Sequence, residues 1–235
     1  MIGAILLDIE GTTTPIDFVH QTLFPFARRQ IAEFVEKNFS SLTDEIESLK
    51  VEHKEDYAEE FYVKEFDETA PASITKYLNF LIDEDRKSTA LKSVQGKIWQ
   101  AGYESGELKS EVFADVPRAF ERWYRQGKTI TIYSSGSVLA QKLIFKYSNC
   151  GNLTAFIADY FDTNVGGKKE TASYRKIAAA LNFPLAEITF VSDSVVELDA
   201  AKPAGLKTIL SIRKGNAPLD GQTAHLNVKS FDEIE

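Results

Sequence analysis

Segments that favour strands alternate with segments that favour helices over the second half of this chain, and this alternation constrains the fold more than any other feature. The strand-like segments are residues 129–133, 188–191 and 208–212. The helix-like segments are residues 115–126, 138–147, 171–181 and 198–204. Strands that alternate with helices are joined by right-handed crossovers and therefore pair in parallel. We expect an α/β fold built on a doubly wound parallel sheet.

The first of these helices has a recognisable start. Asp115 stands where an N-cap residue is expected, and Pro117 falls in the first turn, where its missing N–H costs nothing. Ala119, Phe120 and Trp123 give the helix one apolar face. We expect Asp115 to cap this helix.

The chain begins with another apolar run, residues 2–7, which predicts a buried strand. Asp8 and Glu10 follow directly, and then come Gly11 and threonines 12–14. The carboxyl ends of parallel strands meet at the sheet edge where α/β folds bind ligands. Carboxylates placed there can hold a hard cation such as magnesium, attack an electrophile or move a proton. The residues alone leave these roles open.

Residues 18–112 show no convincing strand pattern and read as helical. A helix over 18–39 is interrupted by Pro25, which is expected to kink or restart it. Residues 43–68 are strongly acidic and predict a solvated helix face. Their aromatic residues share the spacing of one helical face: Tyr57, Phe61, Tyr62 and Phe66. Further amphipathic segments are residues 73–82 and 89–103.

Two domains follow from this division of the chain. We predict that residues 1–16 and 113–235 form the α/β core. Residues 17–112 would form a helical cap inserted after the first strand.

Composition narrows the class of protein further. The 235 residues carry a net charge of −8, which argues against nucleic acid or an anionic membrane as the main partner. No apolar stretch approaches the roughly 20 residues that span a bilayer, and the N-terminal run is too short for a signal peptide. The single cysteine, Cys150, cannot form an internal disulfide and fits a reducing compartment. We expect a cytoplasmic protein, also nuclear if the source is eukaryotic, with neither nucleic acid nor membrane as partner.

Three later segments carry chemistry that suits a phosphate. They are Tyr133-Ser134-Ser135-Gly136-Ser137, Gly166-Gly167-Lys168-Lys169, and Val191-Ser192-Asp193-Ser194 followed by Glu197 and Asp199. Hydroxyls and N–H groups at a helix N-terminus bind anions. Each segment alone also fits a plain structural role, as a helix cap or a solvated turn. Their order and their placement at strand ends favour a shared site.

The order Asp-x-Glu-x-Thr, Ser-Ser-Gly, Lys, Ser-Asp resembles the four motifs of the haloacid dehalogenase superfamily of phosphotransfer enzymes. Within it, the run from Asp8 to Ile16 resembles the enolase-phosphatase (acireductone synthase) family of methionine salvage, in which Glu10 replaces a more usual Asp. Further matching stretches are Leu23-Phe24-Pro25, Asp85 to Lys92, Tyr133 to Leu143 and Ser173 to Ala178. The resemblance covers nearly the whole chain.

The resemblance implies a role for each motif residue. Asp8 would be the nucleophile that forms an aspartyl-phosphate, and Glu10 the acid and then the base. One magnesium ion per chain would lie between Asp8, Glu10 and Asp193, with Glu10 ligating through either its side chain or its backbone.

The remaining motif residues would bind substrate or support the site. Ser134 and Ser135 would bind the phosphate, together with Lys168 or its neighbour Lys169. Glu197 would support Asp193.

The substrate that the resemblance implies is 2,3-diketo-5-methylthiopentyl 1-phosphate, which is enolised and then dephosphorylated to the acireductone. The resemblance also suggests that the protein is a monomer. No residue stands out as the enolisation base. The cap would govern substrate choice. Gln95, Trp99 and Lys109 lie in stretches that resemble the family, although core packing is the better interpretation of Trp99. The alternatives are a phosphatase of this fold for another small phosphometabolite, a phospho-receiver module and a silent scaffold.

Other conspicuous residues predict no further chemistry. His20, His53 and His225 lie far apart without metal-binding spacing, which favours surface or capping roles. Cys150 has no partner motif and is expected to be inert.

Overall fold

The computed structural model describes residues 3–62, 64–218, 221 and 223–235. Ile2, which the sequence places in the first strand, lies outside these residues. The described chain divides into two compact units, one of residues 1–21 and 109–235 and one of residues 22–108. The inserted unit is therefore narrower at both ends than the predicted cap of residues 17–112.

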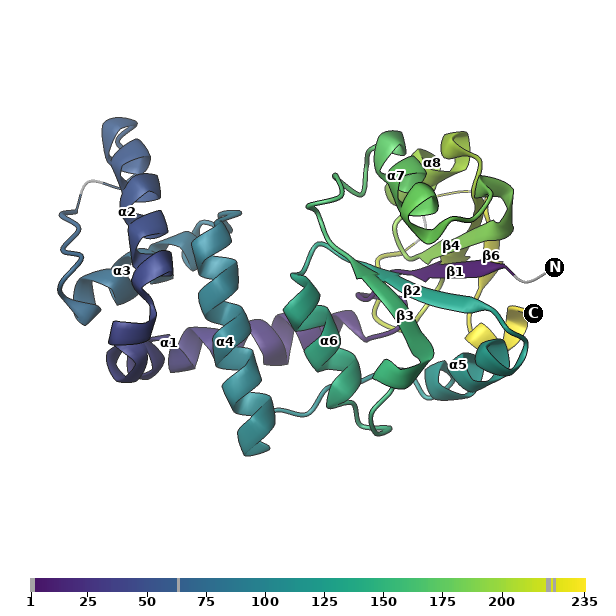
Figure 1. Ribbon diagram of the computed structural model, residues 1–235, viewed down its shortest axis with the longest axis horizontal. Helices are drawn as coiled ribbons and strands as arrows, with labels where there is room; N and C mark the ends of the chain where they lie inside the picture. Colours follow the sequence, from purple (N-terminus) through teal and green to yellow (C-terminus); the bar gives the residue numbers. More distant parts are fainter. Residues whose placement is uncertain (1–2, 63, 219–220, 222) are drawn as a thin grey trace. The chain divides into compact units, whose positions relative to one another are not determined.

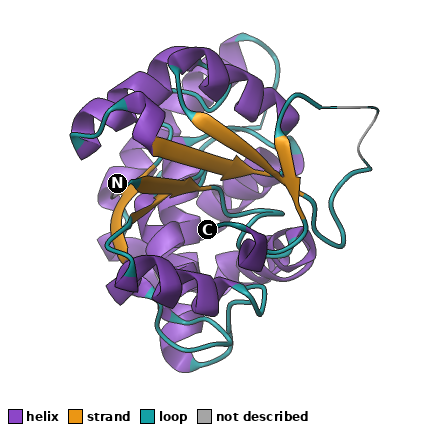
Figure 2. Ribbon diagram, turned by 90° about the vertical axis from the view of Figure 1, so that its right-hand side faces the viewer, coloured by secondary structure: helices purple, strands orange, loops and turns teal. Residues whose placement is uncertain are grey.

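The first unit is built on one sheet of six parallel strands in the order β3-β2-β1-β4-β5-β6 (Figures 1 and 2). The strands are β1 (Ala4–Leu7), β2 (Thr129–Tyr133), β3 (Ile157–Phe161), β4 (Ile188–Ser192), β5 (Lys207–Ser211) and β6 (Leu226–Val228). Leu7 pairs with Ile132 of β2 and with Val191 of β4. The residues that follow β1, β2 and β4 consequently emerge side by side at one edge of the sheet. The predicted α/β class with a parallel sheet is confirmed.

Helices cover both faces of this sheet (Figure 1). They are α5 (Val116–Arg125), α6 (Val138–Lys146), α7 (Thr171–Leu181) and α8 (Val195–Ala201). On one face, Tyr174 and Ile177 of α7 and Leu198 of α8 are buried in a cluster with strand residues. On the other face, Phe120 of α5 packs against Phe145 of α6. Burial of these apolar side chains is the main force that holds the helices on the sheet.

The second unit consists of α1 (Phe24–Asn38), α2 (Thr43–Ala58), α3 (Pro71–Asp83) and α4 (Thr89–Ser105). The predicted restart at Pro25 is confirmed, because a π-helical turn over Phe18–Leu23 precedes α1 and Pro25 lies in the first turn of α1. Trp99 is buried and its indole N–H donates to the Leu23 carbonyl, which confirms its packing role. No helix within the described residues is both long and apolar enough to cross a membrane.

The acidic segment 43–68 differs from its prediction. Helix α2 ends at Ala58, and Glu60 then takes a left-handed conformation with φ of 60°. The face is not fully solvated, because Asp56 is 2% exposed and accepts hydrogen bonds from the Tyr77 hydroxyl and from Arg86. His53 is buried as well, stacked on Phe66, so the surface role expected for it is wrong. A buried carboxylate is tolerated when it is paired and hydrogen-bonded, as Asp56 is.

Candidate active site

Three of the residues predicted for the site stand directly after adjacent strands. Asp8 follows β1, Ser134 follows β2 and Asp193 follows β4. Since β2, β1 and β4 are neighbours in the sheet, the strands themselves bring the three side chains to one edge. This edge is where ligands bind in open parallel sheets.

Asp8 is nearly enclosed and both of its carboxylate oxygens are engaged. Its side chain is 7% exposed. Oδ1 lies 2.6 Å from Lys168 Nζ and accepts a hydrogen bond from the Ile9 N–H at 2.7 Å. Oδ2 accepts a hydrogen bond from the Ser192 hydroxyl at 2.9 Å. The contacts fix the orientation of the carboxylate, as a positioned nucleophile requires.

Lys168, and not Lys169, is the lysine that reaches Asp8. The backbone before it is held by the Tyr133 hydroxyl, which donates to the Gly166 carbonyl, and by the Ser173 hydroxyl, which donates to the Gly167 carbonyl. Lys169 is exposed. Burial works against the charged form of Lys168, but the Asp8 and Glu197 carboxylates outweigh it and raise its pKa. The ammonium therefore remains a cation where phosphoryl charge would arrive.

Glu197 supports Lys168 rather than Asp193, contrary to expectation. Its Oε2 lies 2.7 Å from Lys168 Nζ and accepts a hydrogen bond from the Ser192 hydroxyl at 3.0 Å. Ser192 thus contacts both Asp8 and Glu197, a role that the sequence did not reveal. Burial and the nearby Asp8 raise the pKa of Glu197. The two carboxylates therefore hold the Lys168 ammonium between them, and the Ser192 hydroxyl bridges the same two carboxylates.

Glu10 and Asp193 add two further carboxylates near Asp8 at this edge of the sheet. Burial, with the charge of Asp8, raises the pKa of Glu10, while His20 opposes the shift. The His20 Nε2 lies 3.6 Å from Glu10 Oε2, so this exposed histidine adjoins the site, which its sequence context did not indicate. Burial and Asp8 raise the pKa of Asp193 to about 7, against the opposing effect of Lys168.

The loop after Asp8 is held by its own turn and by distant donors. Gly11 has φ of 63° and donates its N–H to the Thr14 carbonyl. A Cβ at this position would lie 2.3 Å from Asp193 Oδ2, so only glycine fits. Asn216 Nδ2 and the Ser211 hydroxyl both donate to the Gly11 carbonyl, at 3.0 and 3.3 Å. The position of Glu10 and of the loop therefore depends on residues some 200 positions later.

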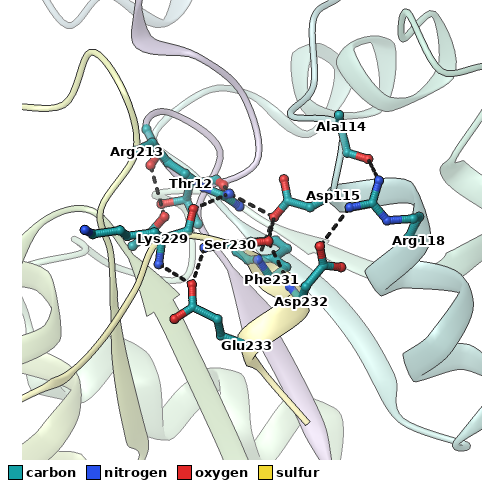
Figure 3. A network of polar contacts seen from close by, with 12 residues as sticks. Thr12, Ala114, Asp115, Arg118, Arg213, Lys229, Ser230, Phe231, Asp232 and Glu233 are labelled. Atoms are coloured by element: carbon teal, nitrogen blue, oxygen red, sulfur yellow. Dashed lines mark hydrogen bonds and ion pairs between the residues drawn. The ribbon is translucent and has the colours of Figure 1, made fainter.

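A buried ion pair anchors the next residue of the same loop (Figure 3). Arg213 donates to the Thr12 carbonyl at 3.3 Å and lies 2.8 Å from Asp115 Oδ2. The same Asp115 oxygen accepts hydrogen bonds from the Phe231 N–H and the Ser230 hydroxyl. Asp115 occupies the N-cap position of α5 but makes no side-chain cap hydrogen bond, so the expected cap is wrong. Its carboxylate serves the ion pair instead.

The serine segment after β2 forms a polar turn before α6. Ser134 is buried, and its hydroxyl accepts a hydrogen bond from the Gly136 N–H at 3.2 Å. Ser137 caps α6 by accepting from the Ala140 N–H. Ser135 is exposed. The plain capping role thus belongs to Ser137, and the phosphate-binding roles of Ser134 and Ser135 stay predictions.

The donor set limits how a metal ion could be held. Within the part of the chain that the structure describes, no three His, Cys, Asp or Glu side chains converge on one point. Burial raises the pKa of Asp193 and of Glu10, and the negative charge of Asp8 adds to both shifts, so a cation at this edge would be favoured. Magnesium is usually bound by one or two carboxylates with waters and substrate phosphate. The residues present fit that mode of binding.

The raised pKa of Asp193 predicts a pH-dependent stability of the metal-free protein. Its folded-state value of about 7 exceeds the ordinary 3.8, so the folded protein binds the proton more tightly than the unfolded chain does. The resulting stabilisation is complete below pH 3.8 and is lost as the pH rises through 7. We expect Asp193→Asn, which stays neutral, to gain in stability over the wild type between pH 4 and pH 8, by about 1.4 kcal/mol per pH unit at the steepest point. Urea unfolding in the presence of a chelator measures this, and a pH-independent difference would contradict the raised pKa.

Comparison with known proteins places this site in a family. The family model of haloacid dehalogenase-like hydrolases matches residues 2–205. A protein named enolase-phosphatase E1 from Synechococcus elongatus is 47% identical over 99% of this chain and 98% of its own length. A protein of the same name from Drosophila willistoni is 46% identical over 96% of this chain and 93% of its own.

Solved structures agree with the sequence comparison. The UTR4 protein of Saccharomyces cerevisiae matches with a TM-score of 0.78 and 34% identity, covering 99% of both chains. CbbY from Rhodobacter sphaeroides, in complex with phosphate, shares the fold with a TM-score of 0.60 at 16% identity, over 100% of this chain and 96% of its own. Fold and site thus define a hydrolase of the haloacid dehalogenase type. Within that class, the chain belongs to the enolase-phosphatase E1 family.

Proposed function

We propose that this chain is a magnesium-dependent enolase-phosphatase that converts 2,3-diketo-5-methylthiopentyl 1-phosphate to the acireductone and phosphate in methionine salvage. The observation that carries the proposal is the enclosed Asp8 carboxylate, held between Lys168 and Ser192 at the edge of the sheet. Relatives named enolase-phosphatase E1 that match nearly the whole chain support the choice of substrate. The reaction has two parts, an enolisation and a phosphoryl transfer.

Phosphoryl transfer would begin with Asp8. Its carboxylate oxygen forms a bond to phosphorus as the ester P–O bond breaks, and the leaving oxygen takes a proton from Glu10. Burial and the charge of Asp8 raise the pKa of Glu10, which favours the protonated form that a general acid needs. Glu10 then accepts a proton from the water that hydrolyses the aspartyl-phosphate. Lys168, Ser134 and Ser135 bind the phosphoryl oxygens throughout.

One magnesium ion per chain would be held by the Asp8 and Asp193 carboxylates, with Glu10 contributing through its backbone carbonyl. Bound there, the ion supplies a Lewis acid that stabilises phosphoryl and enolate oxygens. We further propose that the protein acts as a cytoplasmic monomer, with the small phosphoester as its partner.

The experiment that tests the function follows both products at once. Purified protein with magnesium is mixed with the diketo phosphoester while ultraviolet absorbance and free phosphate are recorded. We expect an absorbing enol species to appear before or together with phosphate. Release of phosphate from many simple phosphate esters, with no reaction of the diketone, would instead show a phosphatase for another metabolite.

A further inference from the structure

Asn216 presents a buried oxygen beside the carboxylate that follows β4. Its Nδ2 donates to the Gly11 carbonyl at 3.0 Å and to the Ser211 carbonyl at 3.1 Å. Both partners are acceptors only, so the amide nitrogen must face them and the orientation of the amide is settled. The oxygen, Oδ1, therefore points the other way.

This oxygen is buried and accepts no hydrogen bond from any residue that the structure describes. A Cβ built on Gly11 would lie 2.8 Å from it and 2.3 Å from Asp193 Oδ2. Asn216 Oδ1 and the Asp193 carboxylate thus lie on the same side of Gly11, close to a single point. A buried acceptor without a donor is destabilising, which favours a donor supplied from outside the protein chain.

The surrounding negative charges favour a metal-bound water as that donor. Asp193 and Glu10 are carboxylates and add acceptors, not donors, when ionised. Magnesium keeps several of its waters when it binds to proteins, and such waters are strong donors to carbonyl oxygens. We propose that Asn216 Oδ1 accepts a hydrogen bond from a water in the coordination shell of the magnesium ion held at Asp193.

Asn216 is therefore a positioning residue that sets magnesium affinity, while Ser211 provides a matched control. Ser211 donates to the same Gly11 carbonyl through its hydroxyl. If Asn216 acted only by holding the loop, removing either donor would have a similar effect. If Oδ1 holds a metal-bound water, only the loss of Asn216 weakens metal binding.

Calorimetric titration of the metal-free protein with magnesium chloride, without substrate, tests the proposal. We expect Asn216→Ala to raise the magnesium dissociation constant about 10-fold, the size typical of residues that support metal ligands from outside. Ser211→Ala should change it less than about 3-fold. Asn216→Asp keeps an acceptor oxygen but loses both amide donors, and should bind magnesium at least as tightly as the wild type.

The proposal rests on the magnesium site of the proposed function, and different results would contradict the magnesium site and the role of Asn216. A wild-type protein that binds no magnesium would contradict that site and with it the present inference. Wild-type binding that is unchanged in Asn216→Ala overturns the role of Asn216 alone. Equal weakening in Asn216→Ala and Ser211→Ala, or weaker binding in Asn216→Asp than in Asn216→Ala, would leave only loop support. If Asn216→Ala does not fold, the magnesium affinity of Asn216→Asp still tests the role of the oxygen.

Discussion

Replacing Asp8 with asparagine is expected to lower the rate of phosphate release by a factor of about 10⁴ or more, because it removes the oxygen that attacks phosphorus. The fold should be unaffected. The asparagine carbonyl can keep the contacts with Lys168 and the Ile9 N–H, while its NH₂ group faces the Ser192 hydroxyl. That hydroxyl can then accept from the amide and still donate to Glu197. The loss is therefore chemical and not structural.

Steady-state phosphate release, with circular dichroism and thermal unfolding for the fold, measures this effect. Asp199→Asn is the matched control, since Asp199 carries the same side chain, 65% exposed, against His225. It should keep wild-type turnover. Because enolisation breaks a C–H bond and not the ester, Asp8→Asn should also raise the ratio of enol formed to phosphate released. Phosphate release by Asp8→Asn within about tenfold of the wild type would rule out an aspartyl-phosphate at this residue.

The sequence predicted the parallel sheet well because the hydrophobic periodicity of a strand or a helix depends only on residues that are close together in the sequence. It missed β3 and β6, and the reason is physical. β3 is an edge strand in which Ala158 and Asp159 are exposed, so it lacks the continuous apolar run of the central strands. The end of α2 at Ala58 carries no Gly or Pro signal either, and depends on packing around Tyr62 and Tyr77.

The site was predictable only where strands deliver its residues. Asp8 and Asp193 follow buried strands, so their meeting was implied by parallel pairing. Lys168 comes from a loop, where sequence narrowed the choice to two adjacent lysines and only the fold of Gly166 and Gly167 separates them. Roles such as that of Asn216 depend on contacts with backbone carbonyls far away in the chain. No local pattern marks a side chain whose partner is the backbone.

Removing the carboxylate of Asp115 is expected to cause the largest loss of stability among these changes, about 3–5 kcal/mol. The Arg213 side chain is 5% exposed, so Asp115→Ala leaves a buried cation without its counter-ion. The Phe231 N–H also loses its acceptor, which lies at 2.6 Å. Cation–π contacts still stabilise the Arg213 charge in this variant. The guanidinium carbon lies 4.6 Å from the ring centroid of Phe113 and 4.7 Å from that of Phe231. Unfolding in urea, followed by circular dichroism, measures the free energy of unfolding.

The control lies in the same network (Figure 3). Arg118 pairs with Asp232 at 2.7 Å, but its side chain is 62% exposed, so Arg118→Ala should cost less than about 1 kcal/mol. The double variant Asp115→Ala with Arg213→Ala should be less destabilised than the sum of its parts, because it leaves no unpaired charge. A cost of Asp115→Ala no greater than that of Arg118→Ala would mean that the ion pair does not stabilise the fold. Arg213 also donates to the Thr12 carbonyl, so removing Arg213 should displace the loop that follows Asp8. The ion pair therefore couples the stability of the core to the position of the nucleophile.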